Sequence, residues 1–408
     1  MQLNMRQICF ILSFFMVQIS FSQGIKSVEI GHWKGELAMN DRLFIPFLID
    51  FSNAQNKIQM EIRNADERIE MNLSIQQDSV QANFPEVDAY LKFKLAENKR
   101  EIRGYWVNLN KKVITKIPFN AWFINELIEM APNTSNITGR WKTTFSPNSQ
   151  EPEIAVGIFE QVAGTIKGTF LTETGDYRYL GGTIGTNKFM MSTFNGSWAF
   201  MFEGRVVGDS LYGDFYSGQK YHTNWVAVRD ENAKLRDEES LTYVANNKPF
   251  QFEKVLNLKG KKFDFTNQKF KNKVVVFQIM GTWCPNCIDE TKMLNSFYAD
   301  FKDKGLEVIA IGYEVGTNPK QQIKRLKAFK KRLGIPYEVL LAGTNDKNFA
   351  SEQFPMLNGI MSFPTSIIID RKGKIRYVHT GFSGPATGAE YLKLKTKFQN
   401  EIEGLLNE

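Results

Sequence analysis

The sequence has very few of the residues that usually hold metals or tie a fold together. Its 408 residues include three cysteines and three histidines. Cys9 lies in the apolar N-terminal stretch, so Cys284 and Cys287 form the one pair in the rest of the chain. A structural zinc site needs about four ligands, and a disulfide framework needs several cysteine pairs. The sequence therefore argues against both, and we expect no metal and no cofactor.

Long apolar runs and massed charge are scarce as well. The apolar stretch at residues 8–21 has 14 residues, fewer than the roughly 20 of a membrane-spanning helix. Because Arg6 precedes this stretch and small residues follow it, we predict a secretory signal peptide at residues 1–23. We therefore expect a protein of the periplasm or cell envelope, and an uncleaved N-terminal anchor stays open. The net charge of +7 is scattered along the chain, which argues against nucleic-acid binding.

Short runs of alternating apolar and polar residues fill the chain from about residue 25 to residue 230. Residues 57–62 are one example, and turn residues such as Asn195 and Gly196 separate runs of this kind. Many short, evenly spaced strands are typical of antiparallel sandwiches and barrels. We therefore predict an all-β N-terminal region, and we find no catalytic constellation in it.

The β region also contains a weak internal repeat. The sequence Gly-His-Trp-Lys at residues 31–34 is echoed by Gly-Arg-Trp-Lys at residues 139–142. Gly-Tyr-Trp at residues 104–106 is echoed by Gly-Asp-Phe at residues 213–215, and the two intervals are 73 and 74 residues. We interpret the region as a duplicated antiparallel β unit with a helical joint near residues 120–130.

The cysteine pair lies in the sequence Gly-Thr-Trp-Cys-Pro-Asn-Cys, between an apolar run and a helical pattern. This position, where a strand turns into a helix, is typical of a redox-active pair. Residues three apart on a helical turn lie roughly 5–6 Å apart, within the Cα range of a disulfide. A helix N-terminus also favours a thiolate. We therefore predict that Cys284, nearer to solvent, attacks a disulfide and that the shielded Cys287 resolves the intermediate.

From about residue 250 onward, predicted strands and helices alternate, which indicates an α/β domain with crossover helices. The strands expected at residues 274–279 and 306–311 flank the helix that carries the cysteines. The sequence Ser-Phe-Pro-Thr at residues 362–365 precedes an isoleucine-rich strand. Proline is common at a strand start because it cannot donate to the ladder. From the residues alone, an ordinary trans proline is the expectation there.

The C-terminal part resembles the thioredoxin superfamily, and more closely its TlpA/ResA branch. The resemblance rests on Trp-Cys-Pro-Asn-Cys-Ile-Asp-Glu at residues 283–290, then Phe-Pro-Thr, then the hairpin Ile-Ile-Ile-Asp-Arg-Lys-Gly-Lys-Ile. It implies a thioredoxin-like fold, a cis bond before Pro364, and an acid/base role for Glu290 toward the resolving cysteine. Gln278 stands where cytoplasmic thioredoxin has a buried aspartate, and it cannot carry a proton as a carboxylate does. If Glu290 is not the relay, water or Glu314 must be.

Together, these observations predict a multidomain chain with five segments. They are a signal peptide at 1–23, β-rich units at 24–130 and 131–230, a linker at 231–248, and a thioredoxin-like domain at 249–408. A short apolar patch in the linker is expected to dock on a neighbouring part of the molecule.

The predicted activity is extracytoplasmic thiol–disulfide exchange, in the direction that reduces protein disulfides. Cys284 and Cys287 form the redox disulfide, Trp283 shields one side, and the backbone at Phe363 and Pro364 holds the substrate strand. The expected partners are protein disulfides and a membrane electron-donor protein. The motif does not set the direction, which depends on the reduction potential.

Two other classes of function stay open. A copper-handling protein would bind the metal with the two thiolates and His379. An interaction protein would bind a ligand or partner through its β region and use the redox domain as an accessory. His32 and His222 lie alone among aromatic residues, so we predict structural roles for them. The alternative for Glu290 is a first-turn residue that complements the helix dipole.

Overall fold

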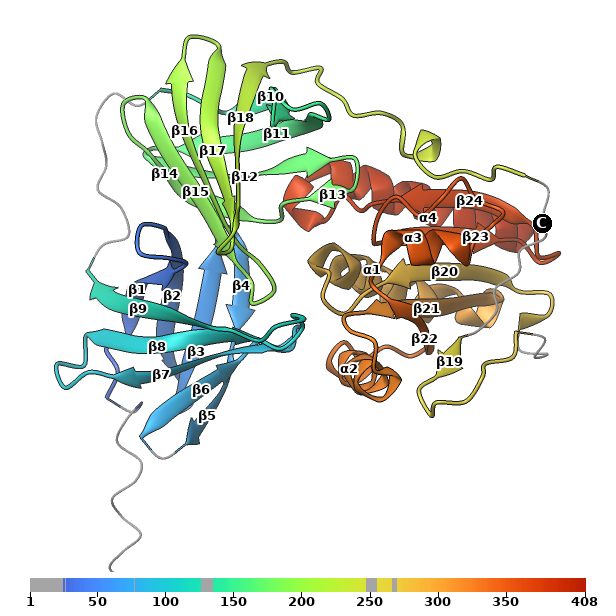
Figure 1. The fold of residues 1–408 in the computed structure, drawn as a ribbon, viewed down its shortest axis with the longest axis horizontal. Coiled ribbons are helices and arrows are strands. Elements are labelled where there is room, and N and C mark those ends of the chain that lie inside the picture. The colour runs from blue at the N-terminus through green and yellow to red at the C-terminus, as the bar shows by residue number, and fades with distance from the viewer. Residues whose placement is uncertain (1–24, 26, 77, 126–134, 247–254, 266–269) are drawn as a thin grey trace, which may run out of the picture.

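The structure is a computed structural model that describes residues 25, 27–76, 78–125, 135–246, 255–265 and 270–408. Two β-rich units lie next to each other, and an α/β domain lies beside both of them (Figure 1). The predicted signal peptide at 1–23 lies outside the described residues. Within the described ranges, no helix is both long enough and apolar enough to cross a membrane.

The first β unit is a single antiparallel sheet. Buried and exposed residues alternate along its longer strands, as expected when one face of a sheet covers a core. Its nine strands are β1 (Gly31–Ala38), β2 (Phe44–Ala54), β3 (Lys57–Asn64), β4 (Glu67–Glu70), β5 (Asn72–Gln76), β6 (Ser79–Asn83), β7 (Ala89–Leu95), β8 (Glu101–Asn108) and β9 (Lys116–Ile124). Their order in the sheet is β4-β3-β2-β1-β9-β8-β7-β6-β5.

The second β unit is a closed barrel. Its strands are β10 (Gly139–Phe145), β11 (Glu153–Val162), β12 (Thr165–Thr172), β13 (Gly175–Asp176), β14 (Leu180–Ile184), β15 (Lys188–Phe194), β16 (Ala199–Val207), β17 (Ser210–Ser217) and β18 (Tyr221–Arg229). Their order is β11-β10-β18-β17-β16-β15-β14-β12-β13, and the pairing of β11 with β12 closes the ring. Stacked and edge-on aromatic side chains such as Phe170, Phe202 and Trp225 fill the interior. The barrel interior is therefore a packed core.

The internal repeat seen in the sequence corresponds to a repeat in three dimensions. In each unit the first strand pairs with both the second and the last: β1 with β2 and β9, and β10 with β11 and β18. Trp33 and Trp141 each donate an indole N–H to the carbonyl four residues earlier, at 3.0 and 2.9 Å. A Cβ on Gly104 or Gly213 would lie 2.3 or 2.0 Å from a carbonyl oxygen of the neighbouring strand. The prediction of a duplicated antiparallel β unit is confirmed.

The predicted helical joint is wrong where the structure describes it. Residues 120–124 continue β9, in which Phe119 and Ala121 point inward while their neighbours are exposed. This two-residue alternation favours a strand, and the aromatic residues that we assigned to a helix pack well on a pleated surface. Residues 126–130 of the proposed joint lie outside the described residues.

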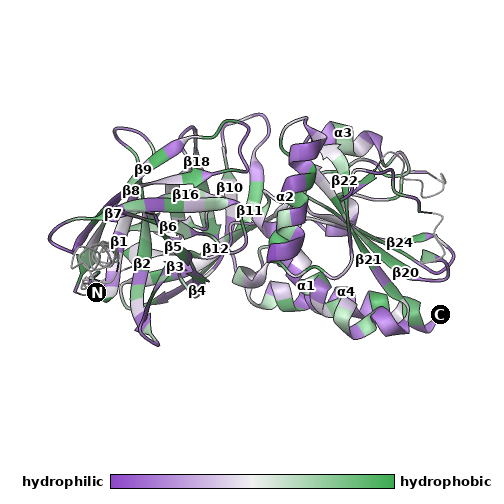
Figure 2. Cartoon of the chain, turned by 90° about the horizontal axis from the view of Figure 1, so that it is seen from below, coloured by the Kyte–Doolittle hydropathy of each residue, from purple (hydrophilic) through white to green (hydrophobic). Residues whose placement is uncertain are grey.

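The C-terminal domain has a mixed sheet with helices on both faces, as predicted. Its elements are β19 (Leu256–Asn257), β20 (Val274–Met280), α1 (Pro285–Phe301), β21 (Leu306–Glu314), α2 (Pro319–Arg332), β22 (Glu338–Thr344), α3 (Lys347–Glu352), β23 (Thr365–Ile369), β24 (Ile375–Thr380) and α4 (Ala389–Asn407). The strand order is β19-β22-β21-β20-β23-β24, with β20, β21 and β22 parallel. Figure 2 shows α1 and α4 along one side of the sheet and α2 and α3 along the other. Every residue of β20 and β21 is buried, which explains their mostly apolar sequences.

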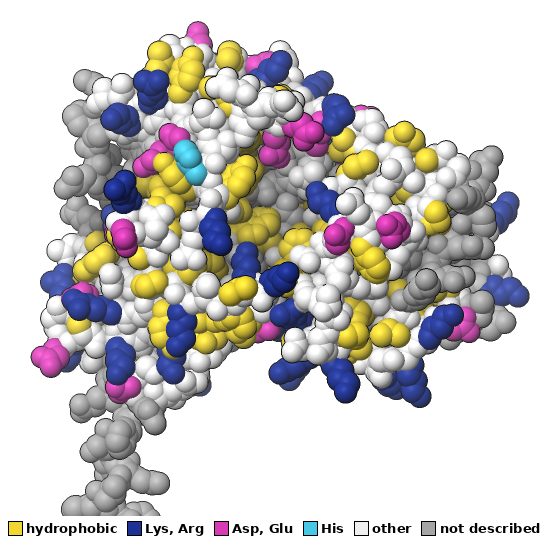
Figure 3. Space-filling model, viewed as in Figure 1, with side chains coloured by type: hydrophobic (Ala, Val, Ile, Leu, Met, Phe, Trp, Pro, Cys, Tyr) yellow, Lys and Arg dark blue, Asp and Glu magenta, His cyan; other side chains and the backbone are white. Residues whose placement is uncertain are grey.

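The predicted linker packs on the α/β domain, as expected from its apolar patch. Val244 forms an isolated β-bridge with Leu357, and the Ala245 N–H donates to the Met356 carbonyl at 2.9 Å. The face shown in Figure 3 carries Lys and Arg on both the β units and the α/β domain, without a single massed patch. This distribution agrees with the scattered charge of the sequence.

Candidate active site

The two cysteines lie where β20 ends and α1 begins. Cys284 is the N-cap of α1, and the backbone N–H of Cys287 donates to its Sγ at 3.2 Å. The two residues form a disulfide with a Cα–Cα distance of 5.3 Å, within the range expected from their spacing. Pro285 occupies the first helical turn, where its missing N–H removes no helical hydrogen bond. The local sequence therefore builds the strand–turn–helix context that we predicted for the pair.

The proline segment at the start of β23 lies against the cysteines. The Phe363–Pro364 peptide bond is cis, as the resemblance implies. The carbonyl oxygen of Phe363 lies 3.4 Å from Sγ of Cys284. The ring of Trp283 packs edge-on against Phe363 with a centroid distance of 5.7 Å, and its indole N–H donates to the Tyr313 carbonyl at 2.9 Å. The structure thus brings the expected cysteine, tryptophan and proline segments together at the N-terminus of α1.

Glu290 lies one helical turn beyond Cys287 and is completely buried. Its carboxylate accepts a hydrogen bond from the Gln278 amide at 2.8 Å and another from the Ser366 hydroxyl at 2.9 Å. Burial raises the pKa of Glu290 to about 7, although both hydrogen bonds favour the ionised form. A carboxyl group that titrates near neutral pH can both take up and release a proton there. This property suits the acid/base role implied by the resemblance.

A neutral hydrogen-bond network connects Glu290 with the backbone of Cys287. The Gln278 amide also donates to the Cys287 carbonyl at 3.2 Å. The Thr291 hydroxyl lies 2.7 Å from that carbonyl and 3.1 Å from the Gln278 side-chain oxygen. Our sequence analysis missed Thr291 and Ser366 as site residues. The signal for Ser366 was available, because it is the cross-strand neighbour of Gln278 in the β20–β23 register.

Glu314, the other candidate relay, lies on a different side of the turn. It ends β21, is fully buried, and accepts hydrogen bonds from the backbone N–H and the hydroxyl of Thr282, both at 2.8 Å. Burial raises the pKa of Glu314 to about 7. Its hydrogen bonds hold the turn that leads into Trp283, whereas the hydrogen bonds of Glu290 lead to Cys287. The two carboxylates therefore contact different parts of the segment that carries the cysteines.

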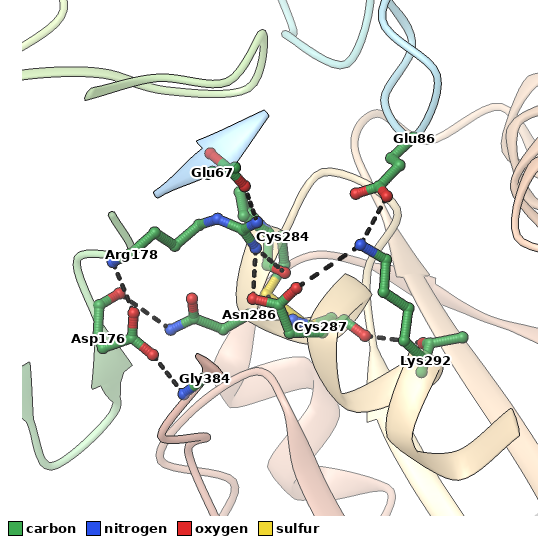
Figure 4. Close-up of polar contacts among 12 residues, drawn as sticks. Glu67, Glu86, Asp176, Arg178, Cys284, Asn286, Cys287, Lys292 and Gly384 are labelled. Carbon is green, nitrogen blue, oxygen red and sulfur yellow. Dashed lines mark hydrogen bonds and ion pairs between the residues drawn. A yellow bond between two sulfur atoms is a disulfide. The ribbon is translucent and has the colours of Figure 1, made fainter. Parts of the chain in front are cut away.

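Both cysteines are buried, so the expectation that Cys284 lies near solvent is wrong in this arrangement. The exposed fraction is 3% for Cys284 and 0% for Cys287. A segment of the barrel lies on the turn that carries the cysteines (Figure 4).

We term this segment, residues 173–178 around β13, the cover. The carbonyl of Asp176 accepts a hydrogen bond from the Asn286 side chain at 3.2 Å. The carbonyl of Thr174 accepts one from the Ser362 hydroxyl at 3.0 Å. The cover therefore bridges the cysteine turn and the residues that precede the cis proline.

Arg178, the last residue of the cover, joins three parts of the molecule (Figure 4). Its guanidinium lies 2.5 Å from Asp289 on α1, 2.7 Å from Glu67 on β4, and 3.2 Å from the Pro285 carbonyl. Burial lowers the pKa of Arg178, but Asp289 and Glu67 outweigh it and raise that pKa above its usual range. The side chain therefore stays charged. Our sequence analysis did not identify Arg178, which is 111 residues away from both of these carboxylates.

The histidines lie in structural surroundings. The ring nitrogens of His379 lie 2.5 Å from Glu401 and 3.4 Å from Glu238. His32 and His222 each pair with an aspartate on a neighbouring strand. Among the residues that the structure describes, no group of three or more His, Cys, Asp or Glu side chains is arranged to hold a metal. His379, the third ligand that the copper-handling alternative needs, is therefore already paired with carboxylates.

Comparisons with known proteins agree with this geometry. The Redoxin family model matches residues 239–393. Thiol-disulfide oxidoreductase ResA of Bacillus thuringiensis subsp. konkukian is 30% identical over 139 residues, which are 34% of this chain and 72% of that protein. ResA of Halalkalibacterium halodurans is 24% identical over 177 residues, 43% of this chain and 85% of that protein. A thiol:disulfide interchange protein of the thioredoxin family from Chlorobium tepidum TLS covers 40% of this chain and 99% of its own, with 22% identity and a TM-score of 0.30.

The mixed sheet, the cysteine pair at the start of α1 and the cis proline beside it define a thioredoxin-like redox protein. Through its C-terminal domain, the chain belongs to the ResA-like thiol–disulfide oxidoreductases. It is therefore a redox enzyme. The two β units lie almost entirely outside the stretch matched by the family model.

Proposed function

We propose that this enzyme works outside the cytoplasm and reduces protein disulfides with its Cys284–Cys287 dithiol. The observation that carries the proposal is the position of Cys284 at the N-terminus of α1, beside the carbonyl of Phe363. The free N–H groups and the dipole of a helix N-terminus stabilise a thiolate and lower its pKa. Cys284 is thus the attacking thiolate, and Cys287, one turn deeper, is the resolving thiol.

The exchange proceeds in two steps. The Cys284 thiolate attacks one sulfur of the substrate disulfide, and the other substrate sulfur leaves as a thiolate. Cys287 then gives its proton to Glu290 and attacks Sγ of Cys284, which releases the second substrate sulfur. The substrate has gained two electrons and is a dithiol, while the enzyme has become the Cys284–Cys287 disulfide. The raised pKa of Glu290 and its position one helical turn beyond Cys287 support the proton step.

The residues around the pair bind and orient the substrate in this proposal. Trp283 and Phe363 form an aromatic wall on one side of Cys284. The Phe363 carbonyl next to the cis bond of Pro364 can accept a hydrogen bond from an extended substrate strand, once the sulfur of Cys284 is engaged in the reaction. Main-chain pairing of this kind binds many protein sequences without selecting a particular side chain.

The cellular setting is part of the proposal. The apolar segment at residues 1–23 supports export to the periplasm or cell envelope. There, a membrane electron-donor protein supplies the two electrons that reopen the disulfide. We also propose the domain organisation predicted from the sequence: β units at 24–130 and 131–230, a linker at 231–248, and the redox domain at 249–408.

Trapping of the mixed disulfide tests this proposal. Cys287→Ser keeps the attacking thiol of Cys284 but lacks the thiol that resolves the mixed disulfide. A substrate protein should therefore stay attached to Cys284. The variant should show no multiple-turnover activity. Cys284→Ser is the matched control, because it also keeps one thiol but lacks the attacking one. Mass spectrometry that finds no mixed disulfide in Cys287→Ser, or finds equal amounts in the two variants, contradicts the proposal.

A further inference from the structure

Three loops lie beside the N-terminus of α1. They are the turn that carries Asn286, the residues just before Pro364, and residues 381–384 after β24. The N–H of Gly381 donates to the Pro364 carbonyl at 2.9 Å, which ties the third loop to the second. In the proposed function a substrate strand reaches Cys284 across these loops. Their joint surface is therefore the entrance to the dithiol.

The cover, residues 173–178, contacts all three loops. Its hydrogen bonds with the first two loops, at Asn286 and Ser362, are described above. At the third loop, the Asp176 carboxylate accepts a hydrogen bond from the Gly384 N–H at 2.5 Å. The contact leaves no spare room, because a Cβ on Gly175 would lie 2.0 Å from the Asn286 amide nitrogen. The cover therefore fills the entrance.

The cover is fixed to the barrel by Tyr177. The ring of Tyr177 packs at the barrel core with centroid distances between 5.1 and 5.7 Å to four phenylalanines, Phe145, Phe200, Phe202 and Phe215. The cover thus packs into the barrel through an apolar side chain and contacts the α/β domain through polar groups. The entrance can open only if the barrel moves as a body or if Tyr177 leaves its aromatic surroundings.

The contact that holds the cover in place is ionic. Arg178 pairs with Asp289 and Glu67, and the three side chains are only 5%, 5% and 13% exposed. We term these three residues the latch. A cleft of about 540 Å³ borders Arg178, Asp289 and Lys292, so solvent reaches the edge of the latch. Polar contacts between domains within one chain permit relative motion as the default.

We propose that the barrel closes the active site in this arrangement and must separate from α1, with the latch broken, before a protein disulfide can reach Cys284. This inference rests on the proposed function, because it concerns access of a protein substrate to the same sulfur. The second β unit is then a gate that selects by size: small thiols and small disulfides reach Cys284 more readily than a folded protein does.

Labelling of Cys284 by reagents of different size tests the gate in the full-length chain. In a Cys287→Ser background, the rates with iodoacetamide and with a polyethylene glycol maleimide are read by mass at Cys284. The closed form should react much more slowly with the large reagent. Arg178→Ala leaves two buried carboxylates without their cation, so it should speed the large reagent about tenfold by raising the open population. Arg205→Ala is the matched control, since this barrel arginine contacts the Tyr212 ring and not the latch.

A second pair of variants covers the case in which Arg178→Ala fails to fold. A Cβ on Gly384 would lie 2.9 Å from the Asp176 carboxylate and 3.1 Å from that of Asp289, without the backbone strain of a positive φ. Gly384→Ala should therefore wedge the cover away and speed the large reagent. Gly404→Ala, whose new Cβ would meet nothing within 4 Å, should leave the rate unchanged.

Two results would overturn the gate. One is fast labelling of the parent protein by the large reagent, at the rate found for the denatured chain. The other is equal rates for Gly384→Ala and Gly404→Ala, or for Arg178→Ala and Arg205→Ala when both fold. Alkylation needs no disulfide exchange, so these outcomes do not depend on the proposed function. Loss of exchange with a small aromatic disulfide reagent in the parent protein would instead refute the proposed function.

Discussion

Two neighbouring carboxylates on α1, Asp289 and Glu290, are both buried, but they face different regions of the molecule. Asp289 faces the barrel and pairs with the guanidinium of Arg178. Glu290 faces the sheet and accepts hydrogen bonds from the neutral donors Gln278 and Ser366. A cation compensates the charge of the first carboxylate. Neutral donors only partly offset the burial of the second, so its pKa rises to about 7.

The comparison shows that the partner, and not burial alone, decides what a buried carboxylate can do. The Arg178–Asp289 pair holds two parts of the chain together, and Arg178 lowers the pKa of Asp289, although burial outweighs this effect and leaves that pKa above its usual value. A carboxylate among neutral donors stays poised between its two protonation states near neutral pH. Helix α1 therefore contributes Asp289 to the gate on one face and Glu290 as the proposed proton carrier on the other.

The largest effect is expected when Glu290, the carboxylate among neutral donors, is replaced. Glu290→Gln keeps the shape and one of the two acceptor oxygens but cannot take the proton of Cys287. We expect the turnover of disulfide exchange to fall about 100-fold, the lower end for loss of a general base. The measurement is the single-turnover rate at which the reduced enzyme reduces a small disulfide. Asp300→Asn, which replaces an exposed carboxylate on the same helix, is the control and should stay near the parent rate. Unimpaired turnover in Glu290→Gln would exclude Glu290 from the proton step.

The second prediction concerns stability against pH. The pKa of Glu290 is about 7 in the fold, against 4.5 for an ordinary glutamate. The folded chain thus binds the proton more tightly, so the stability from this group is complete at low pH and is lost as pH rises from about 4.5 to about 7. Glu290→Gln removes this titration.

Thermal unfolding across that pH window measures the effect. The melting temperature of Glu290→Gln should fall less with rising pH than that of the parent protein. The variant keeps part of the slope, because burial raises the pKa of Glu314 to about 7 as well. Parallel curves for parent and variant would show that Glu290 titrates near its ordinary value in the fold.

The dithiol site was largely predictable from the sequence, whereas its surroundings were not. Cys284 and Cys287 lie in one short motif whose spacing agrees with their geometry, whereas the cis bond before Pro364 was implied only by the family resemblance. Local patterns also predicted the strands and helices of the C-terminal domain. The cover itself was not predicted, because Arg178 contacts Pro285 and Asp289 from more than 100 residues earlier in the chain. In the sequence, that segment is only a glycine turn between two strands.

A smaller effect is expected when Gln278, one of the neutral donors to Glu290, is replaced. Gln278→Leu removes a donor that favours the ionised form of Glu290. We expect the pKa of Glu290 to rise further, so the resolving step should need a higher pH to reach half its maximal rate. The pH profile of single-turnover oxidation measures this shift. A shift to lower pH would mean that Gln278 does not stabilise the carboxylate.

The smallest expected effect lies at the contact between α1 and the first β unit. Lys292 pairs with Glu86 of the first β unit at 2.6 Å, but these side chains are 46% and 35% exposed. Exposed ion pairs contribute little because solvent screens them. Lys292→Gln should therefore change labelling of Cys284 by the large maleimide by less than about twofold. An effect as large as that of Arg178→Ala would mean that the gate depends on many surface contacts and not on the latch.

The reduction potential of the Cys284–Cys287 couple tests the central claim most directly. The full-length protein is equilibrated in thiol–disulfide buffers, and its oxidised fraction is read by mass after alkylation under denaturing conditions. We predict a reversible two-electron couple with a potential below about −180 mV, the value of protein disulfide isomerase, as expected of a reductase. A pair that does not open and close reversibly, or a potential well above that value, would contradict the account.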